Sequence, residues 1–357
     1  MTDAYGGTGG IALYNRDVLE AMCEDVTVKS VICVPRVIAA PMQPMPEKLL
    51  FDTAAANGTF AYVKALLRHL RGDTKFDLIY CAHVNLIPLA RIAGLIARVP
   101  WVLCIYGTEA WSPPARLLSR QWAAKAHRVL SISQITLERF RSWCPVANDK
   151  CNIVPNALHL DRYPPLPKDL ALVERYGLSG RKVIMTLGRL DPIELAKGID
   201  RVVRVLPDLL RDIPNITYLI VGSGGDRPRL EALANSLGVG DAVVFTGFVS
   251  EADKPKLYAI ADAYVMPSTG EGFGFVFLEA IASGLPVIAS SIDGGREALL
   301  GGELGWLVDP SDPIQIRTAI IEALATHKSV PQKLAYFSFQ QFQLRVLDAI
   351  RPNARCA

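Results

Sequence analysis

The segment PSTGEGFGFVFLEA, residues 267–280, shows the most informative change of pattern in the chain. It follows an apolar run at residues 263–266 that is typical of a buried strand, and its glycine-rich loop leads into an apolar stretch with helical spacing. Gly272 and Gly274 allow the main chain to approach a ligand closely. The first turn of a helix has N–H groups without helical partners and the positive end of the helix dipole. The segment therefore predicts an anion-binding site.

Two carboxylates flank this predicted anion site, Glu271 before it and Glu279 about two turns into the helix. A carboxylate directed at an anion would repel it, so we expect both side chains to accept hydrogen bonds from hydroxyl groups beside a phosphate. A sugar nucleotide has hydroxyl groups on both sides of its diphosphate. Considered alone, each glutamate has a simpler interpretation. Glu271 would be a solvated loop charge, and Glu279 would be an exposed helix residue.

A second group of charged residues follows the apolar run at residues 182–187. Arg189 comes after Gly188 directly behind this expected strand, and Lys197 precedes Gly198 at the start of the next expected helix. An arginine offers two parallel hydrogen bonds to a phosphate and a lysine offers a compact positive charge. Together with the segment at 267–280, these residues predict one diphosphate pocket built from two loops.

Apolar runs and amphipathic segments alternate along the whole chain, which indicates parallel α/β layers. We expect strands at residues 27–34, 78–81, 101–105, 129–133, 152–156, 182–187, 217–221, 243–246, 263–266 and 286–290, and helices at 10–22, 60–70, 198–210, 229–237, 254–260 and 275–283. The proline-rich stretch 163–168 is the best linker. We predict two doubly wound domains, residues 1–164 and 165–335, and a C-terminal helix in 336–357 that crosses back to the first domain. Sites should then lie beyond the carboxyl ends of the strands.

Composition narrows the function classes. The chain has 357 residues, of which 50% are hydrophobic and 20% charged, enough for two cores. A net charge of +3 without a basic cluster argues against nucleic acid as a partner. Seven scattered cysteines without a C-x-x-C pair argue against disulfides and structural zinc, and the absence of a D-x-D triplet argues against any metal. Because no leader-like N-terminus and no long uninterrupted apolar stretch is found, we expect a cytoplasmic protein with possible peripheral membrane contact.

Arg189, Lys197 and the pair Glu271 and Glu279, in that order, resemble the family 4 retaining glycosyltransferases of the GT-B fold. Further segments that are similar to the family lie at residues 131–134, 154–157, 222–224, 245–248 and 284–288. The resemblance implies two Rossmann-like domains that face each other across a cleft. It also implies transfer of a hexose from a UDP- or GDP-sugar to a glycan, lipid-linked or small-molecule hydroxyl, in polysaccharide or glycoconjugate biosynthesis.

The same resemblance implies roles for individual residues. Arg189 and Lys197 would neutralise the leaving diphosphate in place of a metal ion, Glu271 would contact hydroxyl groups of the donor sugar, and Glu279 would contact the ribose. The remaining expected donor-binding residues are Gly188, Gly222, Phe248, Gly272, Phe273, Gly274, Phe275 and Val276. No cofactor is expected, because the nucleotide sugar is a substrate.

The first domain departs from the family pattern in two places. The glycine loop at residues 6–10, whose Gly9 and Gly10 would face the phosphates and the acceptor, has only five residues before it, where the family has a buried strand. Either that strand is missing or the start is placed too late, and the loop is alternatively a flexible tail. In the segment that also contains Glu109, Tyr106 stands where many relatives have a histidine, and a tyrosine cannot act as a general base near neutral pH. His83 is an alternative histidine for the cleft.

Two other functions compete with this one. The short N-terminus favours a catalytically impaired relative that still binds nucleotide sugars. Gly7, Gly9 and Ala12 match the dinucleotide fingerprint of an NAD-dependent oxidoreductase. That fingerprint requires a strand before it and an acidic residue at the end of the next strand, whereas Glu24 and Asp25 precede the next expected strand. The second alternative therefore fails on context.

Overall fold

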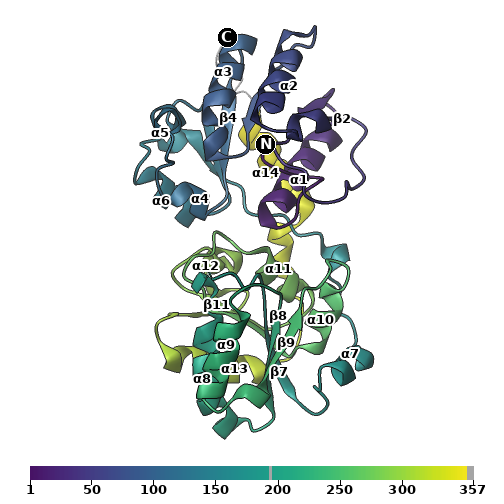
Figure 1. The fold of residues 1–357 in the computed structure, drawn as a ribbon, viewed down its shortest axis with the longest axis vertical. Helices are drawn as coiled ribbons and strands as arrows, with labels where there is room; N and C mark the ends of the chain where they lie inside the picture. The colour runs from purple at the N-terminus through teal and green to yellow at the C-terminus, as the bar shows by residue number, and fades with distance from the viewer. Residues whose placement is uncertain (193–194, 352–357) are drawn as a thin grey trace. The chain divides into compact units, whose positions relative to one another are not determined.

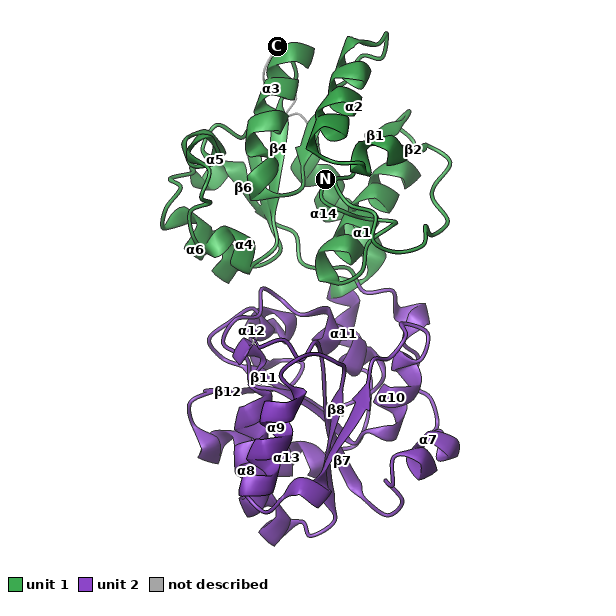
Figure 2. Cartoon of the chain, viewed as in Figure 1, with its two compact units in different colours: residues 1–157, 337–357 green, residues 158–336 purple. Residues whose placement is uncertain are grey.

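The computed structural model describes residues 1–192 and 195–351, which divide into two compact units (Figure 2). Unit 1 comprises Met1–Ala157 together with the segment that begins at Phe337, and unit 2 comprises Leu158–Tyr336. The division between them therefore falls at Ala157 and Leu158, shortly before the proline-rich stretch at residues 163–168.

Unit 2 is built around a six-stranded parallel sheet with the strand order β12-β11-β10-β7-β8-β9. Its strands are β7 (Lys182–Leu187), β8 (Ile216–Val221), β9 (Val243–Gly247), β10 (Ala263–Met266), β11 (Val287–Ser290) and β12 (Trp306–Val308). Its helices are α7 (Leu170–Arg175), α8 (Ile199–Asp212), α9 (Arg227–Ser236), α10 (Lys254–Ile260), α11 (Phe275–Ala282), α12 (Gly295–Ala298) and α13 (Pro313–Ala325). Helices α8, α9 and α13 lie side by side in one layer (Figure 1).

The core of unit 2 explains this topology. Every residue of β8 is buried, as expected for a strand that is covered by helices on both faces of a parallel sheet. Helix α8 contributes Val202, Val203 and Leu206 to the same core. Since neighbouring strands of the sheet run in parallel, their carboxyl ends lie at one edge, where the loops that follow them meet.

Unit 1 contains two separate parallel sheets. The larger has the order β3 (Ile79–Cys81), β4 (Trp101–Ile105), β5 (Arg128–Ser131) and β6 (Cys151–Ile153), and the smaller pairs β1 (Val31–Cys33) with β2 (Leu49–Phe51). Its helices are α1 (Gly10–Glu24), α2 (Thr59–Arg71), α3 (Ile87–Ala97), α4 (Thr108–Trp111), α5 (Leu117–Ala123), α6 (Gln134–Arg141) and α14 (Phe339–Ile350). Unit 1 therefore differs from the predicted doubly wound domain, which would have one continuous sheet.

Helix α14 is close to the C-terminus of the chain but packs on α1 in unit 1. The ring of Phe342 lies edge-on to the ring of Tyr14, with 5.3 Å between their centroids. The Gln343 side chain also donates a hydrogen bond of 3.3 Å to the main-chain oxygen of Ala21. These contacts make the C-terminal helix part of the unit that begins the chain.

Most predicted elements are confirmed, and the differences have local causes. The strands at residues 101–105, 182–187 and 263–266 and the helix at 254–260 have the predicted bounds. The first predicted strand, 27–34, is shortened to β1, because the N–H and hydroxyl of Thr27 both donate to the Asp25 carboxylate and turn the chain there. Strands β2 and β12, of three residues each, were not predicted.

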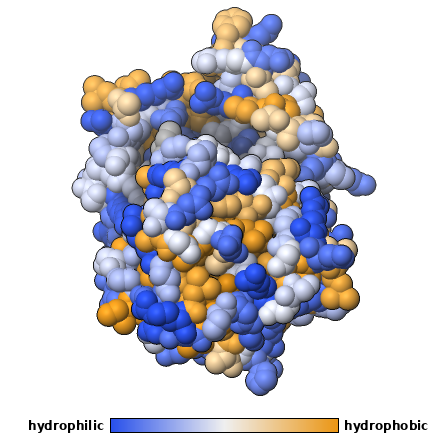
Figure 3. All heavy atoms as spheres, turned by 60° about the horizontal axis from the view of Figure 1, so that its bottom comes forward, coloured by the Kyte–Doolittle hydropathy of each residue, from blue (hydrophilic) through white to orange (hydrophobic). Residues whose placement is uncertain are grey.

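Hydrophobic and hydrophilic residues are interspersed over the face of the protein seen in Figure 3. Among the described residues, no helix is both long and apolar enough to cross a membrane.

Candidate functional site

The loops after β7, β8, β10 and β11 meet at the carboxyl edge of the sheet in unit 2. They are joined by main-chain hydrogen bonds: Leu190 N–H donates to Ser223 at 3.0 Å, and Thr269 N–H donates to Ala196 at 2.7 Å. Gly294 N–H donates in the same way to Glu271 at 2.9 Å. Three loops that carry predicted site residues are therefore held in fixed positions by the fold itself.

Two glycines make this close contact between loops possible. A Cβ atom on Gly222, which has a φ of +139°, would lie 1.9 Å from the main-chain oxygen of Gly188. A Cβ atom on Gly294 would lie 2.2 Å from the main-chain oxygen of Gly272. Because main-chain atoms cannot move aside as flexible side chains do, a side chain at either position would separate the loops.

Lys197 and Glu271 come from two of these loops and approach each other. The Lys197 ammonium lies 3.6 Å from a Glu271 carboxylate oxygen, and about a fifth of each side chain is exposed, 21% and 22% respectively. The aliphatic stem of Lys197 lies over Gly188, where a Cβ atom would be 2.9 Å from its Cδ. Arg189 is exposed on the adjoining loop. The cations and the carboxylate predicted to act together therefore occupy neighbouring loops.

The start of helix α11 belongs to the same loop edge. Gly274 precedes the helix with a φ of +90°, and it has no side chain that could cap the first N–H groups. Phe273 is buried and fixes the loop, whereas Phe275 and Val276 are only half-buried in the first turn. The main-chain N–H groups of such a turn form an anion-binding site together with the helix dipole.

The structure corrects the simple interpretation of Glu279 as an exposed helix residue. Glu279 is 3% exposed, and it accepts a hydrogen bond of 2.8 Å from the Tyr258 hydroxyl. The Lys254 ammonium lies 3.5 Å from its other oxygen. Burial and the Glu279 carboxylate hold the pKa of Tyr258 well above its usual value. Burial lowers the pKa of Lys254, but Glu279 and Glu251 together raise it above the usual value.

Sequence reasoning missed Lys254 and Tyr258 as parts of the site. The two residues are four positions apart on α10, which places them on the same face of that helix. A lysine and a tyrosine at this spacing in a short apolar helix are the only sequence signal that could have suggested a buried carboxylate partner. They fix the direction of the Glu279 side chain before any ligand binds.

Asp293 is a second residue that the sequence did not reveal. It is 2% exposed and accepts hydrogen bonds from the Ser268 hydroxyl at 2.7 Å and from the N–H groups of Glu271 and Gly295, both at 3.0 Å. Burial raises the pKa of Asp293 to about 6, although these hydrogen bonds oppose the shift. Asp293 therefore ties the loop that carries Glu271 to the loop after β11.

Two further predicted donor-binding residues, Gly222 and Phe248, lie after strands β8 and β9. Gly222 N–H donates a hydrogen bond of 3.1 Å to Gly247, and this contact joins the loops after β8 and β9. Phe248 follows on the second of these loops with 82% of its surface exposed. It is the most exposed aromatic side chain among the predicted site residues, since Phe273 and Tyr106 are buried and Phe275 is half-buried.

Tyr106 and Glu109, two of the predicted residues of unit 1, are hydrogen-bonded to each other. The Tyr106 hydroxyl donates to the Asn15 side chain at 2.6 Å, and Tyr106 N–H donates to the Glu109 carboxylate at 2.6 Å. Burial raises the pKa of Glu109. The Nδ1 atom of His83 accepts a hydrogen bond from Asn85 N–H at 3.0 Å, and burial together with Arg36 lowers the pKa of His83.

The glycine loop leads into α1, with Gly9 and Gly10 exposed and Gly9 at a φ of +89°. Its first part is packed, because Gly6 is buried and a Cβ atom there would lie 2.6 Å from the Ile38 side chain. The interpretation of this loop as a flexible tail is therefore wrong.

Comparisons with known proteins identify the family of this chain. The family model "Glycosyl transferases group 1" matches residues 173–338, and "Glycosyltransferase Family 4" matches residues 8–162. Over 250 residues the chain is 38% identical to a GDP-mannose-dependent alpha-(1-6)-phosphatidylinositol monomannoside mannosyltransferase of Mycolicibacterium smegmatis, covering 67% of this chain and 63% of that protein. Over 288 residues it is 30% identical to a phosphatidyl-myo-inositol mannosyltransferase of Mycobacterium tuberculosis, covering 80% and 71%.

Solved structures show the same fold. The Anabaena protein HepE in complex with UDP superimposes with a TM-score of 0.75 at 23% identity, and 97% of each chain is covered. The lipopolysaccharide outer core galactosyltransferase WaaB gives a TM-score of 0.70 at 17% identity. The two units with their parallel sheets define the protein as one of the GT-B class, which confirms the predicted fold class. The chain belongs to the group 1, family 4 glycosyltransferases.

Proposed function

We propose that this protein is a retaining glycosyltransferase that moves a mannosyl group from GDP-mannose to a hydroxyl group of a lipid-linked acceptor. The proposal is supported by the two mannosyltransferase relatives, whose names include a phosphatidylinositol acceptor and, for the more similar one, GDP-mannose. The chain spans 63% of the length of that relative. The acceptor class we infer is a phosphatidylinositol mannoside, used in glycolipid biosynthesis.

The observation that carries the proposal is the meeting of Lys197, Glu271 and the start of α11 at one sheet edge. The two cations and the N–H groups of α11 bind the diphosphate, with Arg189 as a two-pronged donor and Lys197 as a point charge. Glu271 binds the hydroxyl groups of the donor sugar. Glu279, held by Tyr258, accepts from the ribose hydroxyls.

The proposed reaction breaks the bond between the anomeric carbon and the diphosphate oxygen, and it forms a bond from that carbon to the acceptor oxygen. The acceptor attacks from the face that the diphosphate leaves, so the anomeric configuration is retained. Its hydroxyl proton passes to the departing phosphate oxygen. Negative charge grows on that phosphate in the transition state, and preorganised cations and N–H donors lower the barrier by stabilising it.

We further propose that the transfer needs no divalent metal, because Arg189 and Lys197 supply the positive charge that a metal would otherwise provide. A lipid-linked acceptor requires the enzyme to work at a membrane surface, so we propose peripheral contact with the cytoplasmic face of the membrane. A binding protein without transferase activity is the second candidate, and the split sheet of unit 1 is the observation that favours it.

The deciding experiment measures transfer of radiolabelled mannose from GDP-mannose to purified phosphatidylinositol mannosides, with UDP-glucose and UDP-galactose as competing donors. We expect labelled lipid that is cleaved by an α-mannosidase. A thermal shift with each nucleotide sugar, measured in parallel, reports donor binding independently of transfer. Binding of GDP-mannose without any labelled product would favour the second candidate, and binding of UDP-sugars alone would refute the proposed donor.

A further inference from the structure

Helices α3 and α5 of unit 1 pack against each other and leave large apolar side chains exposed (Figure 1). On α3, Ile92, Leu95 and Ile96 have the spacing of residues on one side of a helix, and Leu95 is 68% exposed. On α5, Leu117 and Leu118 are exposed, Leu117 to 63%. Aliphatic side chains that gather on one surface mark a contact with another molecule or with a membrane.

The side chains of Arg91 and Trp122 join the two helices. The Arg91 guanidinium lies over the Trp122 ring, 4.7 Å from its centroid. Leu95 comes one turn after Arg91 on α3, and Leu118 comes one turn before Trp122 on α5. Each leucine therefore lies on the side of its helix that meets the other helix. The exposed apolar residues of α3 and α5 are neighbours on one surface.

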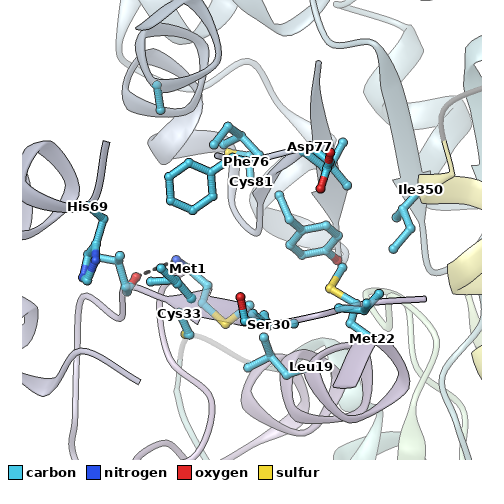
Figure 4. Close-up of a pocket in the computed structure, with 18 of the residues that line it drawn as sticks. Met1, Leu19, Met22, Ser30, Cys33, His69, Phe76, Asp77, Cys81 and Ile350 are labelled. Carbon is cyan, nitrogen blue, oxygen red and sulfur yellow. Dashed lines mark hydrogen bonds between the residues drawn. The ribbon is translucent and has the colours of Figure 1, made fainter. Parts of the chain in front are cut away.

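The opposite side of α3 faces the interior of unit 1. Ala90 and Ala93 line a cavity of about 800 Å³, and part of its lining is drawn in Figure 4. Ile92, Leu95 and Ile96 are not among the residues around this cavity. Their exposure is therefore separate from the cavity, and these three side chains face outward.

The same stretch of chain is almost without acidic residues. From residue 78 to residue 137, Glu109 is the one acidic residue, and its carboxylate already accepts a hydrogen bond from Tyr106 N–H. Helix α2, which packs against α3, has no acidic residue either. Four exposed cations lie on α5 or next to the two helices: Arg98, Arg116, Arg120 and Lys125. None of the four forms an ion pair with any residue that the structure describes.

We propose that this surface docks on an anionic lipid bilayer. The five exposed aliphatic residues and the four cations form what we call the α3–α5 face. Its aliphatic side chains enter the boundary between head groups and acyl chains, and its cations bind the lipid phosphates. A second copy of this chain is a poorer partner, because two such faces would bring their cations together without acidic residues between them. The inference rests on the proposed function, since a lipid-linked acceptor lies in a membrane.

The first experiment measures sedimentation of the full chain with vesicles of phosphatidylcholine, with and without phosphatidylglycerol. We expect binding that requires the anionic lipid and weakens as salt is added. Hydrogen exchange in the bound state should slow at residues 92–98 and 116–121. Absence of binding, equal binding to both kinds of vesicle, or slowing only in other segments would overturn the proposal. Slowing at the same residues at high protein concentration without lipid would assign the face to a second copy and overturn it as well.

Two double variants test the charges and the apolar contact separately. Arg116→Glu with Lys125→Glu should weaken vesicle binding at least tenfold, because each cation near an anionic surface strengthens binding about fivefold. Leu95→Gln with Leu118→Gln should weaken it roughly tenfold through loss of buried apolar area. The Tm of each variant shows that it is folded. Unchanged binding by both folded variants would overturn the proposal.

The matched control makes the same change in net charge away from the face. Lys64→Glu with Arg204→Glu alters exposed positions of α2 and α8, and this variant should bind vesicles nearly as the unaltered protein does. If it loses as much binding as the charge variant of the face, the overall charge of the protein determines binding and the proposal is wrong.

Donor binding and transfer to a detergent-dispersed acceptor are measured on the same variants, and both should be unchanged. Transfer to the dispersed acceptor by a protein that does not bind vesicles would overturn the docking proposal and leave the proposed function standing. Vesicle binding through the α3–α5 face without any transfer would support the docking site and refute the proposed function.

Discussion

The Lys197 ammonium lies 3.6 Å from the Glu271 carboxylate, although 74 positions separate the two residues in the sequence. The lysine ends the short 3₁₀ turn Leu195–Lys197 before α8, and the glutamate stands in the loop after β10. The distance is long for a hydrogen-bonded ion pair. Each group therefore balances the charge of the other while remaining able to bind a ligand of its own.

Lys197→Ala and Arg189→Ala should each weaken binding of free GDP and strongly reduce transfer. Loss of a hydrogen bond to a charged group costs about 1.5–3 kcal/mol of binding free energy. This cost raises the dissociation constant roughly 10- to 150-fold. Isothermal titration with GDP measures this effect. Lys256→Ala, at an exposed position of α10, is the matched control. If both site variants bind GDP as the unaltered protein does, the assignment of the diphosphate pocket is wrong.

Glu271→Gln should lower turnover and leave binding of free GDP nearly unchanged, because we place Glu271 on the donor sugar. Glu279→Ala should weaken the binding of GDP by about 1.5–3 kcal/mol, because we place the Glu279 carboxylate on the ribose. Tyr258→Phe removes one hydrogen bond to Glu279 and should have a smaller effect in the same direction. Titrations with GDP and with GDP-mannose separate the two roles. Equal losses of GDP affinity in the Glu271 and Glu279 variants would contradict this division.

Transfer should continue in EDTA. The proposed stabilisation of the leaving diphosphate comes from Arg189, Lys197 and main-chain N–H groups, none of which depends on a metal. Initial rates in excess EDTA and in EDTA with restored magnesium or manganese provide the measurement. The proposal fails if EDTA abolishes transfer and either metal restores it.

Stability should depend on pH through Asp293. Its pKa is raised from 3.8 to about 6, so the folded protein binds this proton more tightly than the unfolded chain does. The resulting stabilisation is fully present below about pH 4 and is lost as the pH rises through 6. Relative to Asp293→Asn, the unaltered protein should therefore lose up to about 3 kcal/mol of unfolding free energy between pH 4 and 7.

Urea unfolding at several pH values measures this difference for the Asp293 variant. Asp241→Asn, at an exposed position, should show no such trend and serves as the control. A constant difference between the unaltered protein and Asp293→Asn over this pH range would show that the carboxyl group is not perturbed as described.

The sequence by itself determined the strands and the residues that stand directly after them. The run at residues 182–187 is largely apolar, short and followed by a glycine, which favours a buried strand, and Arg189 follows it at the edge where parallel strands place their ligands. Glu271 and Gly274 were predicted in the same way, because a glycine-rich turn between a strand and a helix is a local pattern. Local patterns depend on neighbouring residues alone, and all of these were visible in the chain.

Only the tertiary structure decided what surrounds those residues. Glu279 is buried because α10 covers it, and nothing near residue 279 in the sequence indicates that Lys254 and Tyr258 will meet it. The Asp293 carboxylate accepts a hydrogen bond from the Glu271 N–H group, although 22 positions separate the two residues in the sequence. The open edges of β1 and β3 depend on which strands pair, and pairing is a property of distant segments. Burial and hydrogen bonding between distant segments follow from packing, which no local pattern specifies.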